Sequence, residues 1–192
     1  MPEDDPHRRA RVDRPGDRRR SRRNRRRAHR DARHPQTLAM SHYRHDTVHG
    51  PVGIETDDHE ILAIKVGDTR PTTDPAVPLA VEAARQIDEF YAGKRKRLDL
   101  PFTIEGTEFQ KRVVIAVTRI PYGETRSYAE IARAAGHPNA FRAVGSVMAA
   151  NEMHLLVPCH RVVKSGGATG LYGGGESFKE MLLAFEAEHR DR

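Results

Sequence analysis

Tryptophan is absent from this sequence, and cysteine occurs once, at Cys159. A single cysteine excludes an intramolecular disulfide and any zinc site built from several cysteines. The sequence also lacks an apolar run near the ~20 residues that cross a bilayer. No apolar stretch follows the positive charges of the first residues, which argues against a secretory signal. These absences predict a cytoplasmic protein with no membrane partner.

The formal net charge of +6 belongs to the beginning of the chain. Residues 1–34 hold 14 of the 33 basic and 6 of the 27 acidic residues, which leaves 19 basic and 21 acidic residues in the remainder. The basic stretch has too few apolar side chains to offset the entropy of ordering it, so residues 1–39 are predicted to be a disordered Arg-rich tail. Two interpretations stay open: a tail that binds phosphates without sequence preference, or a spurious extension of the reading frame before Met40.

Residues 40–93 have the pattern of a small α/β domain, with the first ordered segment expected near residue 46. Apolar residues alternate over 62–66, which predicts a half-buried strand. Helical periodicity over 79–91 predicts one amphipathic helix. The basic residues that follow begin a linker at 94–106.

Residues 107–192 predict a mostly helical domain that contains a helix-turn-helix. Capping-box patterns at 107–110 and 127–130 predict the starts of two helices, the second of which is short and ends at Gly136. A third capping box at 177–180 predicts the start of a C-terminal helix. Two short helices joined by a turn with glycine are typical of a helix-turn-helix.

The second helix of this pair is expected to be capped by Pro138-Asn139. Phe141, Val144 and Met148 are spaced to share one face of it. Beyond Arg142 it carries mostly Ala, Gly and Ser, whereas a helix that reads the major groove presents larger polar side chains. Small residues favour close approach to a narrow surface such as the minor groove, and tight helix packing explains them equally well.

The lone cysteine is preceded by apolar residues and followed directly by His160. A free cysteine is most often a buried, inert residue. A reactive thiol instead requires a neighbouring base or positive charge, because the thiolate is the nucleophile. The sequence alone leaves both interpretations of Cys159 open until its other motifs are considered.

Several motifs occur in an order that resembles the O6-alkylguanine-DNA alkyltransferase family. They are Arg142-Ala143-Val144-Gly145, then Asn151, then Pro158-Cys159-His160-Arg161-Val162-Val163, then the glycine-rich loop at 170–175. The resemblance covers about residues 107–188, and residues 46–93 resemble the family's N-terminal domain only loosely. It implies a small antiparallel sheet plus helix, ribonuclease-H-like, followed by a winged-helix-like helix-turn-helix domain.

The resemblance also implies a function in DNA repair, as a methylated-DNA–protein-cysteine methyltransferase. Such a protein acts as a monomer on double-stranded DNA, flips an O6-alkylguanine out through the minor groove and moves the alkyl group irreversibly onto its own cysteine. It acts once and needs no cofactor. O4-methylthymine stays open as a second substrate.

The site residues implied by the resemblance fall into two groups. For the chemistry, Cys159 is the acceptor, His160 draws its proton through a water, Glu186 orients His160, Asn151 holds the turn, and Tyr128 donates to the purine. For binding, Arg142 is implied to fill the space that the flipped base leaves, and Ala143, Gly145 and Met148 to line the contact with the groove. The Val162 carbonyl and the Gly173 N–H are implied to bond to the base, and Tyr172 to form a wall of its pocket.

Three alternatives remain, and the sequence departs from the family at two points. The alternatives are a non-enzymatic alkyltransferase-like lesion-binding protein, a helix-turn-helix regulator and a Cys-His hydrolase. Cys159 argues against the first, and the small residues after Arg142 argue against the second. The family's usual tryptophan is replaced near Val113-Val114, which we attribute to repacking. The cysteines that bind zinc in some members are missing, so zinc is not expected.

Overall fold

The computed structural model describes residues 40–57, 59–73, 77–170 and 172–191. The tail predicted at 1–39 lies outside the described residues. The predicted domain boundaries at 93 and 107, which divide the chain into a first part with the sheet and a second, mostly helical part, stay predictions.

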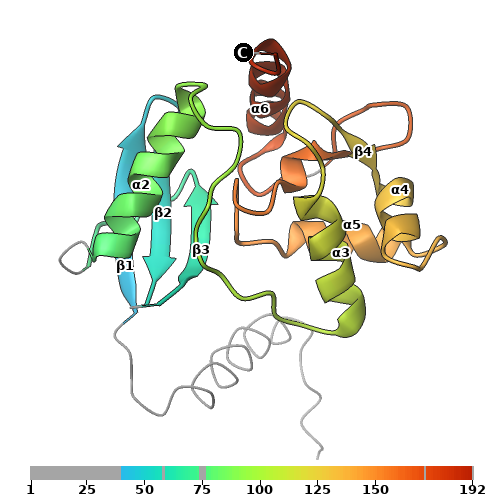
Figure 1. Ribbon diagram of the computed structural model, residues 1–192, viewed down its shortest axis with the longest axis horizontal. Coiled ribbons are helices and arrows are strands. Elements are labelled where there is room, and N and C mark those ends of the chain that lie inside the picture. Colours follow the sequence, from blue (N-terminus) through green and yellow to red (C-terminus); the bar gives the residue numbers. More distant parts are fainter. Residues whose placement is uncertain (1–39, 58, 74–76, 171, 192) are drawn as a thin grey trace, which may run out of the picture. The chain divides into compact units, whose positions relative to one another are not determined.

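An antiparallel sheet begins the described part of the chain. β1 (Ser41–Thr47), β2 (Gly50–Thr56) and β3 (Ile61–Val66) lie side by side in sequence order (Figure 1). Thr47 pairs with Gly50 across the first turn, where a φ of 104° favours glycine. The strand predicted at 62–66 is confirmed, whereas the ordered start expected near residue 46 is wrong, because β1 already begins at Ser41.

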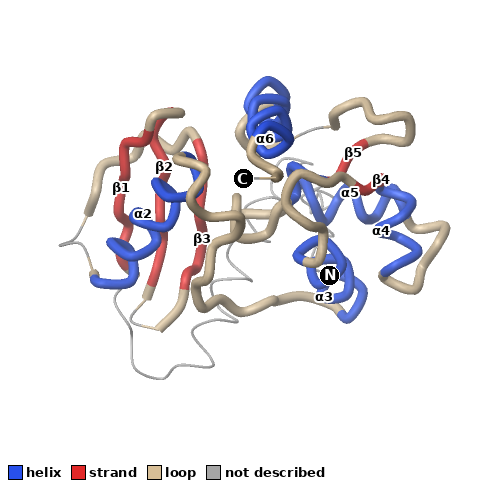
Figure 2. Tube along the Cα trace, turned by 45° about the horizontal axis from the view of Figure 1, so that its top comes forward, coloured by secondary structure: helices blue, strands red, loops and turns tan. Residues whose placement is uncertain are grey.

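Helix α2 (Pro78–Tyr91) covers one face of this sheet, as Figures 1 and 2 show from two directions. Proline suits the start of a helix because the first N–H groups have no partner within the helix. The face toward the sheet is apolar and includes Ile87 and Phe90, both at most 1% exposed. Each such side chain contributes ~1.5–3 kcal/mol through burial. The helix predicted at 79–91 is confirmed, as is the expectation of a small antiparallel sheet plus helix.

Two helices of the second part begin with capping boxes, as predicted. In α3 (Glu108–Thr118) the Thr107 hydroxyl accepts from the backbone N–H of Gln110, whose side chain accepts from the Thr107 N–H at 2.8 Å. In α4 (Tyr128–Ala134) Ser127 and Glu130 form the same reciprocal pair. Each box satisfies two N–H groups that a helix start would leave without partners.

Helix α5 (Phe141–Ala149) packs against α4 and α3 and completes the predicted helix-turn-helix pair. Beside them, β4 (Arg126–Ser127) pairs in parallel with β5 (Val162–Val163). The predicted cap of α5 is wrong: the capping residue is Ala140, and no side chain caps the helix. The predicted shared face is wrong at Phe141, which is 46% exposed.

The last helix, α6 (Glu176–Glu188), begins earlier than the predicted capping box at 177–180. Its capping residue is Gly175, with a φ of 93°, and no side chain caps it. The prediction of a capping box there is therefore wrong, although the helix itself is present. Leu182 of α6 is fully buried in the apolar core that also contains β2, β3 and α2.

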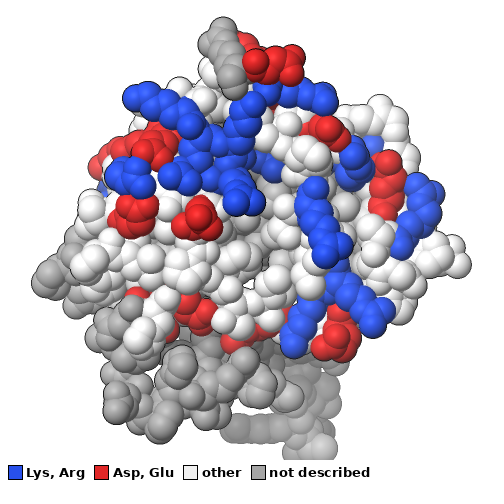
Figure 3. All heavy atoms as spheres, viewed as in Figure 1, with Lys and Arg blue, Asp and Glu red and all other residues white. Residues whose placement is uncertain are grey.

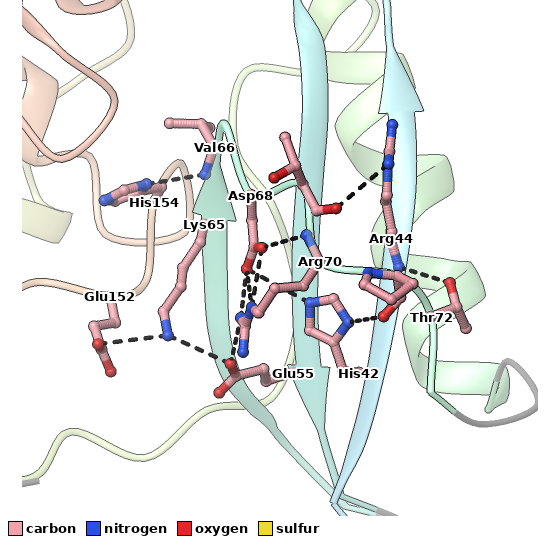
Figure 4. Close-up of polar contacts among 12 residues, drawn as sticks. His42, Arg44, Glu55, Lys65, Val66, Asp68, Arg70, Thr72, Glu152 and His154 are labelled. Atoms are coloured by element: carbon pink, nitrogen blue, oxygen red, sulfur yellow. Dashed lines mark hydrogen bonds and ion pairs between the residues drawn. The ribbon is translucent and has the colours of Figure 1, made fainter.

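The segment that leads to the cysteine is attached to the sheet. The Ile64 N–H donates to Glu152 O at 2.8 Å, and the His154 N–H donates to Ile64 O at 2.9 Å. The Val66 N–H donates to His154 Nδ1 at 3.1 Å (Figure 4). Residues 152–154 thus extend the edge of the sheet beyond β3. This attachment fixes the chain only a few residues before Cys159.

Candidate functional site

Cys159 begins a short 3-10 helix (Cys159–Arg161) and is only 4% exposed. Its Sγ accepts a hydrogen bond from Asn151 Nδ2 at 3.0 Å. Burial raises the pKa of the thiol to about 11, although the Asn151 bond and the nearby Lys179 charge oppose this shift. At neutral pH the group is therefore a thiol, and it becomes a nucleophile only if a base removes its proton.

Asn151 fixes the turn between α5 and the cysteine. Its Nδ2 also donates to Val157 O at 3.3 Å, and its Oδ1 accepts from the Met153 N–H at 3.2 Å. One side chain thus bonds to the backbone on both sides of residues 154–156 and to the thiol. The structure therefore brings Asn151 and Cys159 together.

His160 and Glu186 form a buried pair across the chain. His160 Nε2 donates to Glu186 Oε1 at 2.8 Å, and their side chains are 0% and 1% exposed. Burial lowers the pKa of His160, although the Glu186 carboxylate opposes this shift, so the ring is neutral at pH 7. With Nε2 protonated, Nδ1 carries the lone pair. This atom is buried without a hydrogen-bond partner in the described part of the chain.

Glu186 has a second buried partner in Arg161, which the sequence analysis gave no role. Arg161 Nε lies 2.9 Å from Glu186 Oε2, and Nη2 lies 2.9 Å from Oε1. Its Nη1 donates to Ile120 O at 2.8 Å. Burial alone would raise the pKa of Glu186, but the bonds from His160 and Arg161 outweigh it and hold the pKa below its usual value. His160 and Arg161 are both buried, at 0% and 5% exposed, so neither is a solvated surface residue.

Lys179 is a second functional candidate that the sequence analysis missed. Its side chain is 0% exposed, and its Nζ donates to Val162 O at 2.6 Å. It forms no ion pair with a carboxylate among the described residues. Burial lowers the pKa of Lys179, and the proximity of Cys159 opposes that shift. A buried cation without a counter-ion is costly, so its position next to a thiol requires an explanation. We call Asn151, Cys159, His160, Arg161, Lys179 and Glu186 the thiol cluster.

Two tyrosines and the glycine-rich loop surround the thiol cluster. Burial raises the pKa of Tyr128, and a Cβ at Gly170 would lie 2.5 Å from its hydroxyl. The Tyr172 ring lies 5.1 Å from His154 and 6.2 Å from His160 between centroids, and its buried hydroxyl has no partner within the described residues. A Cβ at Gly173 would lie 2.4 Å from His154 Nε2. Only glycine allows the loop to approach this closely.

Helix α5 presents small residues to solvent. Ala143 is exposed and Gly145 is half-buried, whereas Met148 is only 6% exposed and belongs to the core with Val144. The expectation that Met148 lines a DNA-facing surface is therefore wrong: residues 144 and 148 share one helix face, and that face is buried. Arg142 is exposed and has no carboxylate partner in the described part of the chain.

Positive charge gathers between α3 and α4, although residues 35–192 are nearly neutral. A hollow of about 440 Å³ between these helices is lined by Arg112, Arg119, Arg126 and Arg133, and basic side chains lie over both helices in Figure 3. None of its lining residues belongs to the thiol cluster. The hollow is therefore separate from the acceptor site.

No helix among the described residues is long and apolar enough to cross a membrane. The same residues contain no group of three or more His, Cys, Asp or Glu side chains placed to hold a metal ion.

Known proteins resemble this arrangement in sequence and in structure. Residues 108–188 match the family model of the 6-O-methylguanine DNA methyltransferase, DNA binding domain. The constitutive methylated-DNA–protein-cysteine methyltransferase of Bacillus subtilis is 47% identical over 110 residues, which cover 57% of this chain and 67% of that protein. That of Methanosarcina barkeri is 48% identical over 105 residues, covering 55% of this chain and 66% of the relative.

Solved structures extend the likeness to the sheet. The Mycobacterium tuberculosis O6-methylguanine methyltransferase superimposes with a TM-score of 0.71 at 34% identity, covering 79% of this chain and 94% of that one. A structure of Mycobacterium tuberculosis OGT in complex with DNA gives a TM-score of 0.70 at 36% identity, covering 77% and 93% of the two chains. The chain belongs to the O6-methylguanine DNA methyltransferase family.

Proposed function

We propose that Cys159 accepts the alkyl group of an O6-alkylguanine in duplex DNA, in an irreversible reaction that each molecule performs once. Direct DNA repair by alkyl transfer to a protein cysteine is the activity of the family to which the chain belongs. The observation that carries the assignment is a pair of hydrogen bonds at adjacent residues, from Asn151 to Cys159 and from His160 to Glu186. It brings together a nucleophile, a base and an orienting carboxylate.

The proton of the thiol leaves through His160. Its buried Nδ1 has no partner among the described residues and carries the lone pair that can accept a proton. One water between Nδ1 and Sγ completes the path of the proton. Glu186 fixes the ring so that Nδ1 stays the acceptor and stabilises the imidazolium that forms. Arg161 shares the same carboxylate, which keeps Glu186 ionised while the resting histidine stays neutral.

Lys179 is the counter-charge for the thiolate. In the resting protein the cation faces a neutral thiol, and loss of the thiol proton supplies the missing anion. The thiolate then attacks the alkyl carbon: the S–C bond forms, the C–O6 bond breaks, and its electron pair goes to the purine. The purine takes a proton from Tyr128, which regains one from the imidazolium. The net reaction exchanges the thiol proton for the alkyl group.

The flipped base lies between Tyr128 and the loop at 170–175. Tyr128 donates to the purine, the backbone N–H of Gly173 donates to O6, and the carbonyls of Cys159 and Val162 accept from the exocyclic amine. Lys179 already bonds to the Val162 carbonyl, which holds that acceptor in place. Tyr172 forms a wall of the pocket.

The exposed face of α5 enters the minor groove, with Arg142 filling the space that the flipped base leaves. Ala143 and Gly145 allow the close approach that a narrow groove demands.

The monomer suffices, because every group invoked comes from one chain. We also propose that the sheet part has a ribonuclease-H-like fold and the helical part a winged-helix-like fold. O4-methylthymine is proposed as a second substrate. The lesion-binding alternative is not favoured, because it lacks an acceptor and Cys159 is present.

Titration with methylated duplex tests the proposal. Incubating the protein with excess O6-methylguanine duplex carrying a labelled methyl group is expected to transfer one methyl per protein molecule and then stop. Continued turnover would contradict the single-use mechanism. Tight binding of the duplex without any transfer would support the lesion-binding alternative.

A further inference from the structure

Phe141 is an aromatic side chain that the core does not use. It is the first residue of α5 and is 46% exposed, although its spacing from Val144 and Met148 predicts burial. The described part of the chain has few large apolar side chains this exposed, and Phe141 is the only aromatic one among them; the others are Met40, Val48, Val81 and Ile115.

Its position distinguishes it from a stray surface residue. The guanidinium carbon of Arg142 lies 5.9 Å from the centre of the Phe141 ring, so the two side chains are in contact at the start of α5. Every other exposed residue of this helix has a small side chain; these are Ala143, Ser146 and Ala149. Phe141 and Arg142 are therefore the two side chains that project furthest from the exposed face of α5.

We propose that Phe141 enters the minor groove with Arg142 and acts as a wedge at the base step beside the flipped nucleotide. The inference rests on the proposed function, in which this face of α5 meets the DNA. Successive residues of a helix point about 100° apart, so the two side chains cannot occupy the same gap. Arg142 fills the space of the missing base, and Phe141 presses on the neighbouring step. Apolar side chains inserted in this way unstack a base step and kink the duplex.

A wedge helps most where the base is hardest to extrude. Flipping costs least at a mismatched base, because less pairing has to be broken. Loss of the ring is therefore expected to slow transfer from a lesion that pairs well, and to matter less opposite a base that pairs poorly. A contact that only adds affinity would leave the transfer rate of the saturated protein unchanged on both duplexes.

The test compares Phe141→Ala and Phe141→Leu with wild type under saturating, single-turnover conditions. The substrates are O6-methylguanine duplexes with a well-paired and a poorly paired opposing base, and free O6-benzylguanine. We expect Phe141→Ala to transfer about 10-fold more slowly from the well-paired duplex, with a smaller loss on the poorly paired one and none on the free base. Phe141→Leu keeps an apolar wedge and retains most of the rate.

Val81→Ala is the matched control, since it truncates an exposed apolar side chain of α2. It is expected to leave all three rates unchanged. A wild-type rate for Phe141→Ala on duplex DNA, an equal loss on both duplexes, or a loss on the free base would each overturn the wedge. Failure of the wild-type protein to transfer at all would instead overturn the proposed function.

Discussion

Two polar clusters of this protein differ in how completely their charges are matched. On the sheet, Glu55 of the central strand β2 lies 2.7 Å from Arg70 and 3.4 Å from Lys65 of β3, and Arg70 also binds Asp68 (Figure 4). We call these four residues the sheet cluster. In it each carboxylate is paired with a cation, and the Arg70 side chain that joins them is 47% exposed to solvent. In the thiol cluster the charges are buried, and Lys179 has no carboxylate partner among the described residues.

This difference in charge pairing distinguishes a cluster that serves stability from one that serves the reaction. Paired charges near solvent contribute little and tolerate change, because water replaces a lost partner. Buried charges tolerate little, and an unmatched one is retained only where something else requires it. The unmatched groups of the thiol cluster, Lys179 and the Nδ1 atom of His160, are those that gain partners when the thiol loses its proton. The incomplete cluster is therefore the reactive one.

Removing a carboxylate from each cluster gives the largest expected contrast. Glu186→Gln leaves Arg161 buried without an anion, so the free energy of unfolding is expected to fall by ~3–5 kcal/mol. Transfer should slow by ~100-fold or more, because His160 loses its orienting group. Glu55→Gln in the sheet cluster is expected to cost ~1 kcal/mol or less and leave transfer unchanged. Denaturant unfolding measures the change in stability of each variant, and single-turnover assays measure its transfer rate. Equal losses of stability in the two variants would contradict the difference between the clusters.

His154 tests the attachment between the sheet and the cysteine segment. Burial lowers its pKa from 6.5 to about 4, so the folded state binds the proton less readily than the unfolded state. The stability that this provides is full above pH 6.5 and is lost as pH falls toward 4, by up to ~3 kcal/mol. In His154→Asn, Oδ1 takes the place of Nδ1 as acceptor, and the loss of stability over that pH window should become shallower. Urea midpoints between pH 8 and pH 4 measure the slope; an unchanged slope would exclude this role.

Lys179→Met should have a smaller effect that is specific to the chemistry. Without the cation, the pKa of Cys159 is expected to rise above its value of about 11, and transfer at neutral pH to slow by ~10-fold. The rate should recover as pH is raised, which a purely structural defect would not show. Lys65→Met removes a cation from the sheet cluster and is the matched control. A pH profile that keeps its position in Lys179→Met would contradict the counter-charge.

Local patterns predicted local structure well. The capping boxes at 107–110 and 127–130 were recognisable because all of their partners lie within four residues. The starts of α5 and α6 were not, since neither uses a side-chain cap and the motif at 177–180 lies inside the helix. Spacing places Phe141 on the core face of α5, but only Val144 and Met148 of that face are buried.

The thiol cluster was predictable only in part. Cys159, His160, Asn151 and Glu186 were named from the family resemblance, because no local pattern places residues 160 and 186 together. Arg161 and Lys179 were missed since periodicity assigns charged residues to the surface. The signal for Arg161 was its place inside the Pro158–Val163 motif. For Lys179, only the packing of α6 against the 3-10 helix at Cys159–Arg161 gives one.

The most direct test is the mass of the intact protein after incubation with O6-methylguanine duplex, followed by mapping of the modified residue. The account predicts that the whole population gains a single methyl group in place of a hydrogen, on Cys159, while Cys159→Ser gains none and still binds the duplex. A methyl group on any other residue, or an unmodified protein after the duplex has lost its methyl group, would contradict it.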